Sequence, residues 1–183
     1  MELKGGYGLT LRDILNEAQQ NIGTPISDRD FIRHYNKCLH DLSMVYDSAK
    51  AITTQTIVCE DTTTFYPLTV DIIGVRKVET PEGYNISTFK VQDGAIRFLW
   101  KGSYTVHEFI LHTPIIGLNG TITINTSYLR AIVIYISAHM IKKSDKDNFK
   151  ELMLEFNELA GLANSNIRKN TNKYKKVATR PFR

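Results

Sequence analysis

The feature that most constrains the fold of this chain is a change of hydrophobic period, which happens twice. Apolar residues recur every three to four positions up to residue 50, and they alternate within short β-branched runs from 51 to 125. The helical period returns after residue 126. A length of 183 residues fits one domain that carries an insertion. We therefore expect an α+β fold, in which a four-helix bundle (1–50 and 126–168) is interrupted between its second and third helices by an inserted β-domain (51–125), an antiparallel sandwich or barrel-like subdomain.

Capping residues mark the ends of the expected helices. Thr10 with Asp13 resembles a capping box in which Asp replaces the usual Glu or Gln, and Gly23 is a natural left-handed stop. Ser27 with Asp30 repeats the pattern a few residues later, which predicts an antiparallel helix pair. The expected helices span residues 10–22, 28–47, 127–143 and 146–168.

The middle of the chain contains short runs of alternating or β-branched residues separated by turn residues. Asp93-Gly94 is typical of a two-residue hairpin turn. We expect strands at residues 51–59, 65–68, 72–78, 89–91, 95–100, 104–111 and 120–125.

The net charge of +4 is unevenly distributed. No acidic residue follows Glu158, whereas seven basic residues do, and the chain before them holds 16 basic and 19 acidic residues, a net charge of −3. A basic terminus of this kind binds nucleic acid, an acidic membrane surface or an acidic groove on a protein, or it is a solvated end. We expect an extended basic tail over residues 169–183.

Several classes of protein do not fit the sequence. Two cysteines cannot form a disulfide framework, and no run of apolar residues is long enough to span a bilayer. The first residues lack the apolar core of a signal peptide, so we expect a cytosolic product. Cys38 and Cys59 have no C-x-x-C companion, and we interpret both as small hydrophobic residues.

The candidate catalytic and metal-binding residues are dispersed. His34 and His40 are six positions apart on one helix and therefore diverge, while His107 and His112 fall on opposite faces of a strand. His139 has no second ligand nearby in the sequence. No phosphate loop, G-x-S-x-G or H-E-x-x-H motif is present. We expect no enzyme activity, no metal site and no cofactor.

One group of aromatic residues has two interpretations. Phe98, Trp100, Tyr104 and Phe109 either form a stacking platform for single-stranded nucleic acid or line the inner face of a sheet. The inner face is the more common outcome of such alternation, and we favour it.

The order of these segments resembles that of the head-to-tail adaptor (connector, or head-completion) proteins of tailed bacteriophages. In some members of this family a β-domain is inserted into a bundle of α-helices, between the first helix pair and the last. The likeness rests on layout over nearly the whole chain; in the segment 65–75, Pro67 precedes Leu68, whereas the family tends to place Leu before Pro. It is carried by residues 11–15 with the stop at Gly23, 30–39, 65–75, 138–141 and 149–160, and by the basic tail.

The resemblance implies a structural virion protein, made in the host cytoplasm, that forms a homo-oligomeric ring, typically of twelve copies. Such a ring docks on the portal protein, receives a downstream neck or tail protein, and passes the genomic DNA through its lumen. In the family the C-terminal segment commonly contacts the portal. Here that segment supplies the expected portal-binding residues, which are Arg168, Lys169, Lys173, Tyr174, Lys175, Lys176, Arg180, Phe182 and Arg183.

The alternative function is nucleic-acid binding through the same basic arm. It calls for a second basic surface on the folded body. The only candidates are Arg29, Arg33 and Lys37 with Arg76 and Lys77, and acidic neighbours dilute both groups.

Overall fold

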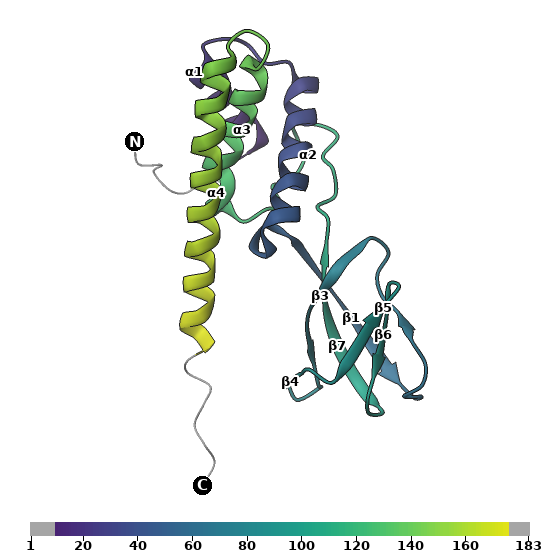
Figure 1. Ribbon diagram of the computed structural model, residues 1–183. Coiled ribbons are helices and arrows are strands. Elements are labelled where there is room, and N and C mark those ends of the chain that lie inside the picture. Colours follow the sequence, from purple (N-terminus) through teal and green to yellow (C-terminus); the bar gives the residue numbers. More distant parts are fainter. Residues whose placement is uncertain (1–9, 176–183) are drawn as a thin grey trace. The chain divides into compact units, whose positions relative to one another are not determined.

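The computed structural model describes residues 10–175, with side chains to residue 169 (Figure 1). It shows an α+β fold, with four helices and two small antiparallel sheets inserted between the second and third helices. The chain divides into two compact units. The β-unit comprises Lys50–His112, and the helical unit comprises the described residues on either side of it. The fold class expected from the sequence is confirmed.

Helix α1 spans Leu11–Ile22 and α2 spans Asp28–Val45. Helix α1 begins and ends, and α2 begins, where the capping residues predicted, while α2 ends two residues before the expected position. The Thr10 hydroxyl accepts a hydrogen bond from the Asp13 backbone N–H at 3.2 Å, and the Asp13 carboxylate accepts one from the Thr10 N–H at 2.8 Å, which completes the capping box. Gly23 ends α1 with φ +66°. A short 3₁₀ helix, η1 (Asp47–Ala49), follows α2.

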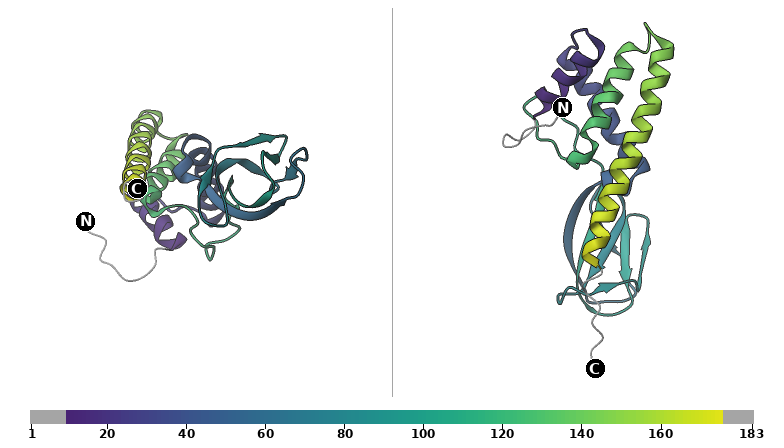
Figure 2. Two further views of the ribbon diagram at one scale, coloured as in Figure 1. Left: turned by 90° about the horizontal axis from the view of Figure 1, so that it is seen from below. Right: turned by 90° about the vertical axis from the view of Figure 1, so that its left-hand side faces the viewer.

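The third helix is the centre of the helical unit. Helix α3 spans Leu129–Ile141 after the 3₁₀ helix η2 (Thr126–Tyr128), and every residue from 131 to 138 is buried. Figure 2 shows α1, α2 and α4 arranged around α3, which contacts all three. A helix enclosed in this way is apolar on every side, which explains why its apolar residues form more than one stripe in the sequence.

The last helix is longer than the sequence predicted. Helix α4 spans Lys146–Lys175, and the Asp145 carboxylate caps it by accepting from the Asn148 N–H at 3.0 Å. Residues 169–175, expected as the start of an extended tail, are therefore helical. They include neither glycine nor proline, so no helix breaker stops the helix where its apolar stripe ends.

The β-unit consists of two sheets around one small core. One sheet has the strand order β1-β7-β3-β4 and the other β2-β6-β5, all antiparallel. The Asp93-Gly94 turn joins β5 to β6 as expected, with positive φ at both residues. The strands are β1 (Ala51–Cys59), β2 (Tyr66–Pro67), β3 (Ile72–Glu79), β4 (Asn85–Ile86), β5 (Phe89–Gln92), β6 (Ala95–Phe98) and β7 (Gly102–Ile110).

The expected strand at residues 120–125 is wrong. This segment is an irregular part of the helical unit, and the β-unit ends at His112. Ile122 and Ile124 alternate with threonines as they would in a strand, but both side chains pack against the helical core. Without a neighbouring strand to bond to, alternation alone does not produce a sheet.

Candidate assembly surfaces

The longest irregular segment of the helical unit is an ordered loop over residues 113–123, which we call the anchored loop. The side-chain amide of Asn36, on α2, holds it: Asn36 donates to the Ile115 carbonyl and accepts from the Ile115 N–H, each at 2.9 Å. Ile115 and Ile124 are buried in the helical core, and Leu118 and Ile122 pack against it. The whole connection between β7 and η2 is long for a compact domain, and ordered connections of this length are usually functional.

Gly120 shows how closely the anchored loop approaches the helices. A Cβ atom at this position would lie 3.2 Å from Ile115 Cγ2 and 3.3 Å from Leu11 Cδ1, on α1. These distances are shorter than ordinary van der Waals contacts, so a glycine lets the backbone pack here without displacing its neighbours. The loop therefore covers the side of the unit that α1 and α2 form.

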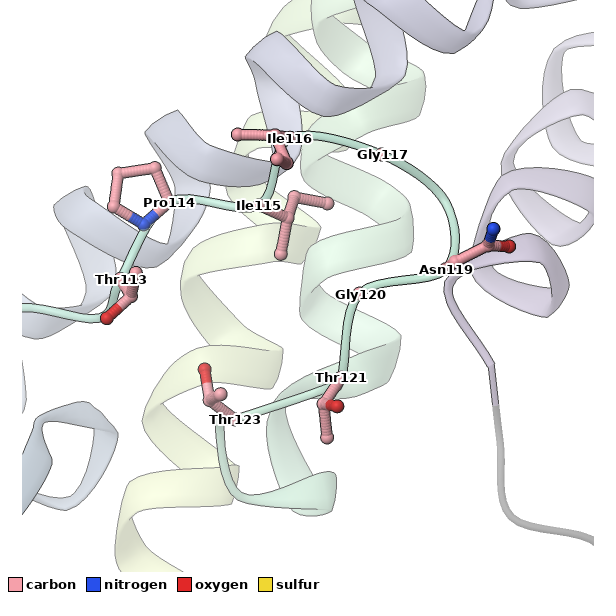
Figure 3. Close-up of a pocket in the computed structure, with 9 residues that line it drawn as sticks. All are labelled: Thr113, Pro114, Ile115, Ile116, Gly117, Asn119, Gly120, Thr121 and Thr123. Atoms are coloured by element: carbon pink, nitrogen blue, oxygen red, sulfur yellow. The ribbon is translucent and has the colours of Figure 1, made fainter.

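The anchored loop contains an isoleucine that is almost fully exposed. Ile116 is 98% exposed, although the residue before it is buried. Beside it lies a hollow of about 440 Å³ that is formed by the loop alone (Figure 3). No charged residue occurs between His112 and Arg130, so the loop that carries Ile116 and forms the hollow is neutral. A rigid, neutral and partly apolar surface favours a protein partner over nucleic acid.

The outward face of α4 forms a second exposed apolar surface. Leu154 and Leu162 are 65% and 60% exposed and lie on the same side of the helix, with Glu158 between them. Gly161 belongs to the same face, and a Cβ placed on it would meet nothing within 4 Å. A glycine costs about 1 kcal/mol in a helix interior relative to alanine. Close packing within the described chain does not account for the glycine at position 161.

The basic residues expected to bind the portal lie only partly within the described chain. Arg168 and Lys169 are exposed on α4. The helix continues through Lys173, Tyr174 and Lys175. The remaining predicted residues lie outside the described range; they are Lys176, Arg180, Phe182 and Arg183. Basic residues at the C-terminal end of a helix also interact favourably with its dipole, which is a structural reason for their position.

The fold brings together two histidines that the sequence analysis treated as isolated. The ring centroids of His34, on α2, and His139, on α3, are 5.3 Å apart, so the expectation that each histidine stands alone is wrong for these two. His139 also stacks on Tyr135 at 4.1 Å. The spacing of residues within one helix cannot predict this pair, because the two histidines lie on different helices.

Burial, assisted by nearby positive charge, lowers the pKa of both histidines of this pair. Burial lowers the pKa of His34 to about 4, and the neighbouring His139 and Arg33 contribute to that shift. Burial also lowers the pKa of His139, assisted by Lys37 and Lys142. The same cations oppose binding of a metal cation. Among the residues described, no three His, Cys, Asp or Glu side chains are grouped so that they could hold a metal ion.

The four aromatic residues considered as a stacking platform do not share a face. Phe98 and Tyr104 are buried and stack at 4.2 Å in the core of the β-unit. Trp100 is half-exposed in the turn before β7. Phe109 lies under the Lys50 ammonium at 4.9 Å. The favoured interpretation, an inner sheet face, holds for Phe98 and Tyr104.

Comparison with known proteins adds no family assignment. No protein-family model matches the chain, and no curated protein matches its sequence. Within the described residues, no helix combines the length and the apolar character needed to cross a membrane.

Proposed function

We propose that this chain is a head-to-tail adaptor of a tailed bacteriophage, which forms a ring on the portal and joins it to the neck or tail. The observation that carries the proposal is the order of elements. A β-unit interrupts a helical bundle between α2 and α3, and the bundle ends in a helix whose last turns are basic. This is the layout on which the resemblance to the adaptor family rests.

The distribution of charge supports a channel-forming ring. The chain before residue 159 has a net charge of −3. A wall with this charge does not hold phosphate groups, so DNA can move past it. Positive charge is concentrated at the end of α4 and beyond, where it can meet an acidic groove on the portal.

The proposal is tested by docking the full chain onto portal-bearing, DNA-filled heads. We expect the wild type to bind as a ring and to retain the genome, and a chain truncated after Lys169 to lose both properties. A chain truncated after Lys175 separates the helical basic residues from those that follow. Unchanged docking and retention by both truncated chains would contradict a role for the basic end in portal binding.

The same truncations address nucleic-acid binding, the alternative function. If the truncated chains lose affinity for DNA in a gel-shift assay while docking persists, the basic end is a phosphate-binding arm. The salt dependence provides a second readout, because the logarithm of affinity falls less steeply with salt when the protein neutralises fewer phosphates.

A further inference from the structure

The helical unit exposes apolar side chains on two opposite sides. Figure 1 and Figure 2 place α4 on one side of α3, and the anchored loop packs against α1 and α2 on the other. Ile116 protrudes from the loop side, and Leu154 and Leu162 are exposed on the α4 side. Two different surfaces on opposite sides of one subunit are what a head-to-tail contact between identical copies requires.

We propose that neighbouring copies of this chain contact each other through these two surfaces, with Ile116 of one copy packed between Leu154 and Leu162 of the next. This inference rests on the proposed ring and names the contact that closes it. The occupant of the α4 face is thus a second copy of the chain. Repetition of a head-to-tail contact gives a ring when the rotation between copies closes.

The shapes of the two surfaces are complementary. Ile116 is a single projecting side chain on a loop that Asn36 and the apolar residues packed on the helical core already hold in place, so little conformational entropy is lost on binding. Opposite it, Gly161 leaves room beside Leu162 on the α4 face, where a side chain would project towards the incoming loop. Contact with the neighbouring copy would therefore explain a glycine that packing within its own chain does not require.

The polar groups of the two surfaces are also complementary. Glu158 lies between the leucines, and burying its carboxylate is costly unless hydrogen-bond donors meet it. The anchored loop supplies donors without charge: the Asn119 amide and the Thr121 hydroxyl, which both line the hollow beside Ile116. Because the loop carries no acidic residue, nothing on it repels Glu158.

The first experiment compares the mass of full-length variants by mass photometry. We expect Ile116→Asp and the double variant Leu154→Asp/Leu162→Asp each to reduce the ring to single chains, with at least a tenfold weaker self-association. Val70→Asp is the matched control, because Val70 is 82% exposed in the β-unit and has no part in the contact. All the substituted positions are exposed, and far-UV circular dichroism verifies that each variant is folded. Variants that form the wild-type ring would overturn the contact.

A second experiment tests the head-to-tail geometry. A chain carrying both Ile116→Cys and Leu162→Cys, treated with a short bismaleimide linker, is expected to give a ladder of covalent products up to the full ring. Chains with Ile116→Cys alone should stay single on the gel, since Cys38 and Cys59 are buried. A covalent dimer from Ile116→Cys alone would indicate a twofold contact and would overturn the proposal.

The failure of this contact is distinguishable from failure of the ring. A wild type that forms rings unaffected by the Asp variants contradicts the contact alone. A wild type that stays monomeric, both free and with portal-bearing heads, contradicts the proposed ring and the contact together.

Discussion

The helical unit and the β-unit are held together by cores of different kinds. The helical core surrounds one enclosed helix, α3, in which eight consecutive residues are buried. The β-unit has a small core between two short sheets, and a carboxylate, Glu108, is 0% exposed within this unit. Both units contain part-buried hydrogen bonds, but the β-unit also buries a carboxylate, whose hydrogen bonds must be satisfied inside its core.

The position of the only tryptophan allows the two units to be observed separately. Trp100 belongs to the β-unit, whereas most of the helical signal in far-UV circular dichroism arises from the other unit. Tryptophan fluorescence therefore follows the unfolding of the β-unit, and far-UV circular dichroism follows mainly that of the helical unit.

The largest effect is expected from a cavity in the helical core. Ile132 is 0% exposed in α3, and Ile132→Ala should reduce the free energy of unfolding of the helical unit by about 2–5 kcal/mol. The circular dichroism transition should move while the Trp100 fluorescence transition stays in place. Met44→Ala, at a residue that is 60% exposed, serves as the control. Equal shifts in both signals would show that the two units unfold as one.

The complementary change removes the buried carboxylate of the β-unit. Glu108 accepts hydrogen bonds from Gln55 Nε2 at 2.5 Å and from the Thr69 N–H at 3.3 Å, which ties the segment after β2 to β7. Glu108→Ala takes this acceptor away from both donors and should destabilise the β-unit by about 1–3 kcal/mol. Here the fluorescence transition should move and the dichroism transition should not. An unchanged fluorescence midpoint, with exposed Glu60→Ala as reference, would show that these hydrogen bonds contribute nothing.

A pH-dependent effect is expected from His34, in the helical unit. The pKa of His34 falls from 6.5 to about 4 in the folded state, so the unfolded chain binds more protons between these values. The contribution of His34 to stability should therefore decrease as the pH falls from 6.5 towards 4, and then level off. Because the pair is only half-buried, we expect a loss of about 1–2 kcal/mol, less than the full shift implies.

The measurement is urea denaturation followed by circular dichroism across that pH range. His34→Gln should reduce the slope, whereas His40→Gln, at an exposed position on the same helix, should leave it unchanged. If stability depends on pH equally in the wild type and in His34→Gln, then His34 is not the cause of the pH dependence.

The smallest effect concerns an unpaired hydroxyl in the helical core. Tyr35 is 0% exposed, and its hydroxyl has no hydrogen-bond partner among the described residues. Tyr35→Phe should leave the stability unchanged or raise it by up to about 1 kcal/mol. Tyr135→Phe is the matched comparison, because the Tyr135 hydroxyl donates to Asp41 Oδ2 at 2.7 Å and its removal should destabilise by about 1 kcal/mol. A clear loss of stability in Tyr35→Phe would show that the hydroxyl is satisfied.

Local sequence signals predicted much of this fold because their physical causes are local. The Thr10 and Ser27 caps, the Gly23 stop and the Asp93-Gly94 hairpin each depend on residues within a few positions of one another. The two changes of period likewise placed the β-unit between α2 and α3. Where α4 ends could not be predicted in this way, because basic residues continue a helix as readily as they form a tail.

The features missed by the sequence analysis depend on contacts between distant segments. Asn36 and Ile115 are 79 positions apart, and the sequence around either residue does not predict the two hydrogen bonds that hold the anchored loop. The His34–His139 pair arises in the same way. The exposure of Ile116 could not be predicted either, since an isoleucine in an apolar run is normally assigned to the core.

Whether this chain forms a ring is decided by the mass of the purified wild type in solution, together with negative-stain images of the same sample. We expect a ring with a central opening and a mass about twelve times the 20.9 kDa of one chain. A particle with the mass of a single chain, unchanged by concentration and by the addition of portal-bearing heads, would contradict it.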